Sequence, residues 1–344
     1  MRTRVIALAA AGLTAAGLGV AMPAGAAVGG PPGITPAAFT PQIATSGTDN
    51  SVEQVRHLAQ CGNTMYAVGR FTQMKKGTAV VTRNNAFSFS TTNGTISSWN
   101  PNVNGQVDGI ALSADCSTAY LGGTFTSVGG TAVKNIAAVS TSTSAVLPGF
   151  AHNAGGRVAT LAMTGNHLLV GGYFKAINNS NQAYMASLSP TTGLNDNYLP
   201  NLQISGTYPG NPNSTRVYNQ QISHDGTRVL VEGDFLTVGG HALQQAFMLN
   251  LGATPTVSNW KATNFDTNCA AVEPFYAQDG AWSPDDSKVY FGTTGYIPLT
   301  GLTIPQSGPC DAALAFNTTA SPQNALWINY AGCDSLYSAE ADNS

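Results

Sequence analysis

Side chains able to carry out acid–base or nucleophilic chemistry are scarce in this sequence. Charged residues make up 9% of its 344 residues, compared with about 25% in a typical globular protein. The sequence contains no His-Glu-x-x-His zinc motif, no Gly-Lys-Ser/Thr phosphate loop and no Gly-x-Ser-x-Gly nucleophile elbow. Because none of these motifs is present, we predict no catalytic residue, no cofactor and no bound metal ion.

A few charged residues recur near the start of segments that alternate between apolar and polar positions. They are Glu53, Asp108, Arg157, Arg216 and Glu273. An extracellular enzyme would need acids, bases or a cofactor site that converge in space. These five residues are a small set of such groups, so an enzyme stays an alternative.

Three other features resemble functional motifs but fit turns better. Ser113–Asp115, Ser223–Asp225 and Ser283–Asp285 are similar to the Asp boxes of sialidases. Ser117 and Ser287 stand where that motif has glycine, and aspartates in turns commonly bond their own backbone. The five histidines fall at unrelated places, which disfavours a shared metal site. Aspartate runs lack the spacing of a calcium loop, so Ca²⁺ remains only an alternative.

A repeated strand motif organises the chain. An apolar segment ending in glycine and an aromatic residue recurs, as in Ala119–Phe125 and Val229–Phe235. The shared glycines lie 49 to 61 residues apart and are Gly69, Gly123, Gly172, Gly233 and Gly292. They would let neighbouring backbones approach near a crowded axis. Each copy follows an alternating segment and precedes two more, the last ending in an aromatic residue: Trp99, Phe150, Tyr198, Trp260 or Trp327.

Four strands per repeat, which we call A to D in chain order, predict the antiparallel blade of a β-propeller. Leu121–Gly130 and Val231–Gly240, together with Trp99–Gly105, resemble the delta-60-type propeller repeats of secreted actinobacterial proteins. The resemblance covers about residues 39 to 337 and implies a propeller fold in an extracellular setting. It carries over no catalytic residues. The Gly-Gly doublets alone are more loosely similar to those of kelch and quinoprotein propellers.

The expected fold is an all-β propeller domain over residues 39–344, with five complete blades. Residues 333–339 would begin strand A of a sixth blade, and Phe39–Ile43 resembles the end of a strand D that lacks its own blade. A C-terminally incomplete ring of six or seven blades explains both, because propellers close by pairing strands from their two ends. The alternative is a complete five-bladed ring with a tail, so the total blade number stays open.

The cysteines fit an oxidising compartment. Cys61 and Cys116 fall in the A–B turns of the first two blades, which share one face of the expected propeller. Cys269 precedes strand A of the fifth blade and Cys310 lies in its B–C loop, and these two connections share the opposite face. Disulfides 61–116 and 269–310 are predicted, with Cys333 unpaired. Free buried thiols are the alternative.

The N-terminus predicts export. An apolar run from Val5 to Met22 follows two arginines, and Ala24–Ala26 has the small-x-small pattern of a cleavage site. Residues 1–26 are expected to be a signal peptide cleaved after Ala26, and residues 27–38 a linker. A membrane anchor is the alternative. The mature protein would be secreted without a membrane span, and its net charge, already −3 in the full chain, disfavours nucleic acid as a partner.

Two function classes remain open. The favoured one is a secreted, non-catalytic propeller that binds a glycan, peptide or cell-envelope ligand on the face formed by the D–A and B–C loops. Expanded connections at 201–214 and 293–309 fall on that face. The ligand-face candidates are Arg157, Tyr208, Arg216, His241 and Tyr296. The alternative is an extracellular enzyme acting on polysaccharide, of the lyase, glycosidase or oxidase type. Ligand identity, oligomeric state and physiological role stay open.

Overall fold

The computed structural model describes residues 37–44, 53–207, 215–267, 269, 275–295, 308–330 and 336–341. Its regular structure is almost entirely β-strand, with a short 3-10 helix at Thr263–Asp266. The expected signal peptide, Cys333 and the ligand-face candidates Tyr208 and Tyr296 lie outside the described residues. None of the helices in the described part of the chain is long and apolar enough to cross a membrane.

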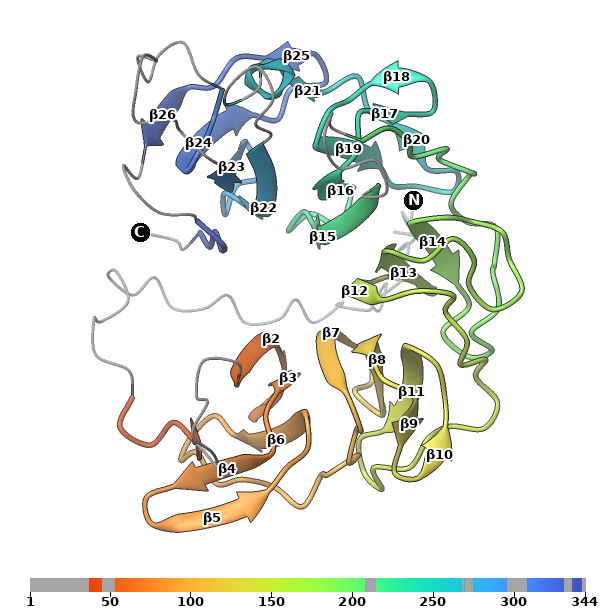
Figure 1. Cartoon of the computed structure of the whole chain (residues 1–344), viewed down its shortest axis with the longest axis vertical. Coiled ribbons are helices and arrows are strands. Elements are labelled where there is room, and N and C mark those ends of the chain that lie inside the picture. The colour runs from red at the N-terminus through yellow and green to blue at the C-terminus, as the bar shows by residue number, and fades with distance from the viewer. Residues whose placement is uncertain are drawn as a thin grey trace, which may run out of the picture.

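Five antiparallel sheets follow one another along the chain and surround a central space (Figure 1). The innermost strands are β2 (Gln54–Cys61), β7 (Gln106–Leu112), β12 (Val158–Thr164), β15 (Arg216–Ile222) and β22 (Phe275–Trp282). Each pairs with a second strand: β3 (Thr64–Arg70), β8 (Thr118–Thr124), β13 (His167–Gly172), β16 (Arg228–Asp234) or β23 (Lys288–Gly295). The third strands are β6 (Ala86–Ser90), β11 (Ile136–Ser140), β14 (Met185–Leu188), β19 (Ala246–Asn250) and β24 (Ala312–Asn317). This is the order expected for strands A, B and C.

The fourth strand is complete in fewer sheets than the sequence predicts. It is present as β20 (Thr256–Val257) and β26 (Trp327–Tyr330), whereas the first three sheets hold their fourth segment by one isolated bridge each. In the first sheet, the Ser97 hydroxyl lies 2.5 Å from that of Ser88 and accepts a bond from the Trp99 N–H at 3.1 Å. The same bond is present in the fourth sheet, where Ser258 Oγ accepts from the Trp260 N–H at 3.2 Å, so this turn recurs whether or not the fourth segment forms a strand.

Smaller strands extend the outer edges of the sheets. β4 (Gln73–Lys76) and β5 (Ala79–Thr82) form a hairpin, as do β9 (Ser127–Val128) with β10 (Thr131–Ala132) and β17 (Thr237–Val238) with β18 (His241–Ala242). β21 (Lys261–Ala262) pairs in parallel with β25 (Pro322–Gln323). β1 (Gln42–Ile43) pairs with β4, so that β1, β4 and β5 form a sheet separate from β2, β3 and β6. The N-terminal strand therefore pairs with the β4–β5 hairpin.

Every innermost strand carries a β-bulge at the same place. Pairing with the second strand skips one residue in each case, namely Arg56, Asp108, Ala159, Tyr218 and Gln278. Four of the repeated glycines, Gly69, Gly123, Gly172 and Gly233, pair with the residue just before the bulge, whereas in the fifth sheet Thr293 holds that place and Gly292 pairs with Asp279. A Cβ on Gly123 would lie 2.1 Å from the carbonyl oxygen of Gln106, so only glycine fits there. The close approach is thus to the bulged strand of the same sheet.

The core lies between successive sheets rather than within one layer. Trp260 is fully buried between the fourth and fifth sheets, where its Nε1 donates to the carbonyl oxygen of Asn317 at 2.8 Å. Trp99 bridges the first two sheets in the same way, donating to the carbonyl oxygen of Ser140 at 3.1 Å. Trp327, at the equivalent place in the fifth sheet, is 46% exposed. Where a further sheet follows, the terminal aromatic of a repeat is buried (Trp99, Phe150 and Trp260) or partly buried (Tyr198).

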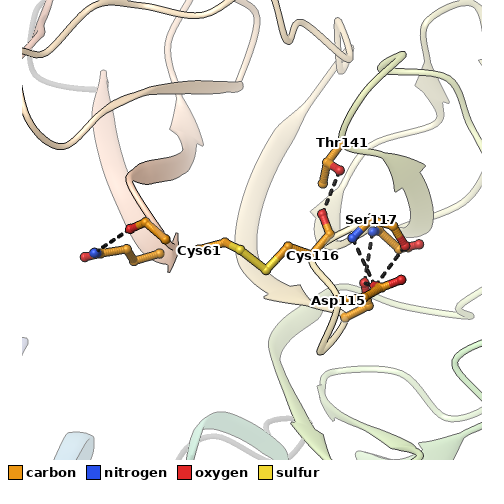
Figure 2. The surroundings of a disulfide bond; sticks show 9 residues. Cys61, Asp115, Cys116, Ser117 and Thr141 are labelled. Carbon is orange, nitrogen blue, oxygen red and sulfur yellow. Dashed lines mark hydrogen bonds between the residues drawn. A yellow bond between two sulfur atoms is a disulfide. The ribbon is translucent and has the colours of Figure 1, made fainter. Parts of the chain in front are cut away.

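Both disulfides expected from the sequence are present. Cys61 at the end of β2 is bonded to Cys116 in the β7–β8 turn (Figure 2). The Thr141 hydroxyl donates to the carbonyl oxygen of Cys116 at 2.7 Å and helps to fix that turn. Cys269 is bonded to Cys310, and both are buried in the core beside the fifth sheet. The first bond ties two neighbouring sheets together, and the second ties the approach to β22 to the β23–β24 connection.

Candidate functional site

A central cavity of about 1220 Å³ lies between the innermost strands. Its wall includes residues of β2, β7, β12, β15 and β22 and of the segment 337–340. A bulge leaves one residue out of the ladder and redirects its side chain. All five bulge residues, Arg56, Asp108, Ala159, Tyr218 and Gln278, belong to this wall. The same irregularity, repeated in each sheet, therefore supplies the cavity with its side chains.

Arginine side chains gather around one buried carboxylate in this wall. Arg157 binds Asp108 through two bonds of 2.8 Å, from Nε to Oδ2 and from Nη2 to Oδ1. Arg56 lies 3.4 Å from the same Oδ1, and Gln106 donates to it at 2.6 Å. The Asp108 side chain is 3% exposed, whereas each of these two arginines is 31% exposed. Two guanidinium groups thus share one carboxylate while still reaching the cavity.

A third arginine extends this cluster through two tyrosine rings. The guanidinium carbons of Arg157 and Arg216 lie 5.0 and 5.2 Å from the centroid of Tyr173, within the range of a cation–π interaction. Nε of Arg216 also donates to the Tyr218 hydroxyl at 3.1 Å, and Nη2 lies 3.6 Å from the fully buried Asp234. Burial raises the pKa of Tyr218, so its hydroxyl stays protonated. We call Arg56, Arg157 and Arg216 the guanidinium end.

Two acidic residues occupy β16 and β22 elsewhere in the site. Asp279 lines the cavity and accepts bonds from the Ser338 hydroxyl at 3.0 Å, from the Ala339 N–H at 3.1 Å and from the side chain of Asn219. Burial raises the pKa of Asp279. Glu232 is fully buried, and neither of its carboxyl oxygens has a hydrogen-bond partner among the described residues. Burial, reinforced by the charge of Asp279, raises the pKa of Glu232 well above its usual value.

Glu232 breaks the pattern of its repeat. The equivalent residues of the other second strands are Val68, Gly122, Gly171 and Gly292. The carboxyl group fits because the facing residue on β22 is Gly280, where a Cβ would lie 2.2 Å from Oε1 of Glu232. The sequence thus pairs an unusual acid with an unusual glycine, directly beside Asp279.

Replacing Glu232 with glutamine should make stability less dependent on pH. Because the pKa of Glu232 is raised on folding, the folded protein retains a proton that the unfolded chain releases near its ordinary pKa. This contribution is complete below that ordinary value and is lost as pH rises toward the folded-state pKa. Each unit of elevation corresponds to about 1.4 kcal/mol. We expect the Tm of Glu232→Gln, measured by calorimetry, to exceed that of the unmodified protein by a margin that widens from about pH 5 to about pH 8. A constant margin would contradict this.

The structure brings together some of the residues singled out in the sequence. Arg157 and Arg216 meet across Tyr173, and Asp108 joins them. Glu53 instead accepts a bond from Thr72 at 3.3 Å, and Glu273 lies outside the described residues. His241 is exposed in β18, in a hairpin at the outer rim (Figure 1), and does not line the cavity.

Sequence reasoning missed five residues of the site: Arg56, Tyr173, Tyr218, Glu232 and Asp279. A signal for two of them was present. Val55, Val107, Val158 and Val217 recur at one position of the innermost strands, and the next residue is always the bulge residue. Aligning the repeats on that valine would have placed Arg56 and Tyr218 with Asp108.

The Ser-x-Asp turns have a structural role. The Asp115 carboxylate accepts bonds from the Ser113 hydroxyl at 2.6 Å and from the backbone and hydroxyl of Ser117 (Figure 2). These bonds, the one from Ser113 first, lower the pKa of Asp115 to about 2. Asp225 forms the same kind of turn with Ser223 and Thr227. Within the part of the chain that the structure describes, no group of three or more His, Cys, Asp or Glu side chains is arranged to hold a metal ion.

The described residues define an all-β, propeller-like protein. No family model matches this chain, and no curated protein matches it. The chain is similar in fold to the hydrazine synthase of Kuenenia stuttgartiensis, with 10% identity, coverage of 81% of this chain and 67% of that chain, and a TM-score of 0.45. It is also similar to a Bacteroides uniformis protein assigned as a 6-phosphogluconolactonase, with 14% identity, coverage of 78% and 68%, and a TM-score of 0.47. Neither activity transfers to this chain at such similarity.

Proposed function

We propose that this chain is a secreted, non-catalytic propeller that binds a glycan, peptide or cell-envelope ligand in its central cavity. The ligand would enter from the face formed by the D–A and B–C loops. The observation that supports this is the convergence of the bulge residues on one cavity, whose wall also includes Arg157 and, in contact with Arg216, Tyr173. Polar side chains placed in a cavity by a rigid scaffold are the usual design of a binding site.

A blocking substitution tests the binding site. Ala159 is an unpaired bulge residue in the cavity wall, so Ala159→Trp should narrow the cavity without disturbing the sheets. We expect ligands found by screening oligosaccharide, peptide and cell-wall arrays to bind this variant at least about tenfold more weakly, a loss of about 1.4 kcal/mol. His241→Ala, at the outer rim, is the control and should bind normally. A ligand retained by Ala159→Trp and lost by His241→Ala would place binding outside the cavity.

We also propose that the ring has six or seven blades, with Leu336–Glu340 as the inner strand of a sixth. Leu336 lies against Gly292 and donates its N–H to the carbonyl oxygen of Thr293, much as Val158 lies against Gly122. On the other side of the open part of the ring, Leu58 is 50% exposed, whereas its equivalent Ile110 is 2% exposed. An experimental structure of the secreted protein with only five sheets would refute this proposal.

We also propose that the protein is exported and that its signal peptide is cleaved. Two disulfides are consistent with an oxidising compartment. N-terminal sequencing of protein recovered from culture medium should begin at about Ala27. Sequence beginning at Met1 would contradict cleavage.

The alternative function, an extracellular enzyme acting on polysaccharide, has one specific observation in its favour. Asp279 faces the cavity with its pKa raised by burial, and a carboxyl group that retains its proton can act as a general acid. An enzyme would release new reducing ends or unsaturated products from polysaccharide, and Asp279→Asn would lower the rate by about 100-fold or more. Stoichiometric binding without product would favour the binding function.

A further inference from the structure

The guanidinium end carries more positive charge than its own carboxylates neutralise. Arg56, Arg157 and Arg216 face Asp108 and Asp234. Asp108 alone is shared by two arginines, and Arg56 is held to it by a single contact of 3.4 Å. One guanidinium charge is therefore left over, on the arginine that is held least tightly.

Unused hydrogen-bond donors accompany this charge. Arg157 commits Nε and Nη2 to Asp108, and its Nη1 donates to no described residue. Arg56 donates no hydrogen bond to a described residue, and both side chains are 31% exposed toward the cavity. Guanidinium groups with free donors bind carboxylates and phosphates through two parallel bonds. A single excess charge matches one monoanionic carboxylate.

The remainder of the wall is suited to hydroxyl groups. It presents the amides of Gln54, Asn219 and Gln278, the rings of Tyr218 and Tyr337, and the carboxyl groups of Asp279 and Glu340, which can accept hydrogen bonds from hydroxyl groups. Amides both donate and accept hydrogen bonds, and tyrosine offers an apolar ring with a polar tip. The cavity, at about 1220 Å³, exceeds the range of about 300–1,000 Å³ typical of small-molecule sites. An extended ligand rich in hydroxyl groups fits this wall better than a single small molecule.

We propose that the cavity binds an acidic oligosaccharide and that one uronate carboxylate lies on Arg56 and Arg157. This inference rests on the proposed binding function and assigns its ligand class. The hydroxyl groups of neighbouring sugars bond the amide side chains, and Arg216 holds Tyr173 and Tyr218 in place beside them. Asp108 keeps Arg157 oriented while leaving the second guanidinium group for the ligand.

Calorimetric titration with matched oligosaccharides tests the assignment. The probes are tetramers of galacturonate and of a glucuronate-containing glycan, their methyl-esterified counterparts, and a sulfated tetrasaccharide. We expect at least one uronate tetramer to bind about tenfold or more tightly than its methyl ester, the worth of one charge-assisted bond. Added salt should weaken uronate binding because part of the attraction is electrostatic.

Arg56→Gln should abolish the preference for the acid over its ester, since it removes the excess charge and leaves the Asp108–Arg157 pair intact. Lys134→Gln is the matched control, because Lys134 is exposed and lies outside the cavity wall. Its preference should equal that of the unmodified protein. Equal binding of acid and ester, tighter binding of the sulfated probe, or an unchanged preference in Arg56→Gln would overturn the ligand class while leaving the binding function standing. If no probe and no array ligand binds, both fail.

Discussion

Replacing Trp260 with alanine is expected to lower the free energy of unfolding by about 3–5 kcal/mol, the usual cost of truncating a large buried aromatic side chain. Trp260 is fully buried and packs on Phe291 and Phe316, with ring centroids 6.2 and 6.1 Å away. Its Nε1 bond to Asn317 would also be lost. The cavity left between the fourth and fifth sheets cannot close easily, because strands on both sides are held by their own ladders. Urea denaturation followed by tryptophan fluorescence and circular dichroism measures the loss.

Trp327→Ala is the internal control for this experiment. Trp327 stands at the same place of its repeat, yet it is 46% exposed and contacts Tyr290 with one face. Its loss should cost about 1 kcal/mol or less, as for most exposed side chains. Equal losses at both tryptophans would contradict the exposure of Trp327 and would indicate that another sheet covers it in the secreted protein.

Asp108→Asn is expected to destabilise the protein by about 2–4 kcal/mol, because breaking a buried ion pair leaves its partner charge uncompensated. The estimate is below the value for a fully buried pair, since the arginines are 31% exposed and partly hydrated. Asparagine keeps the shape of the side chain, so the loss reports charge rather than volume. Urea titrations of Asp108→Asn, Arg157→Gln and the double variant form a double-mutant cycle.

The double variant gives the decisive comparison. If the two side chains act together, the double variant should lose less free energy of unfolding than the sum of the two single variants. Its loss should also be smaller than that of Asp108→Asn alone, because no unpaired guanidinium charge remains. Strict additivity would show that Asp108 stabilises the inner strands by some means other than its bond to Arg157.

The repeat could be predicted from the sequence because it recurs as glycines and aromatic residues at positions where few other residue types fit. Gly123 and its equivalents mark the second strands, since a Cβ there would collide with backbone. The cysteine pairing followed from knowing which connections share a face. What the sequence could not reveal was the bulge. Bulging depends on how a strand pairs with its neighbour, and Val107-Asp108-Gly109 carries no sign by itself that Asp108 leaves the ladder.

Only part of the candidate site could be predicted, because the sequence shows the position of a residue in its strand but not the direction of its side chain. Arg157 and Arg216 were found by their position at strand starts, but the interaction of both with Tyr173 depends on side-chain directions that only the folded chain provides. Glu232 was hidden within a well-matched strand motif. Its burial became apparent only with Gly280, which lies on another sheet and about 50 residues away in sequence.

The repeated bulge also allows the ligand-facing side chains of a duplicated sequence to change independently of the residues that maintain the fold. A residue that stands outside the ladder and faces the cavity can change without altering strand register or the core between sheets. Arginine, aspartate, alanine, tyrosine and glutamine occupy this one place in successive repeats. Copies of a single ancestral unit could thus diverge in recognition while their scaffold stayed constant. The same positions, apart from Asp108 with its ion pair to Arg157, make a compact library for directed evolution, in which new specificities are sought by randomising only the bulge residues.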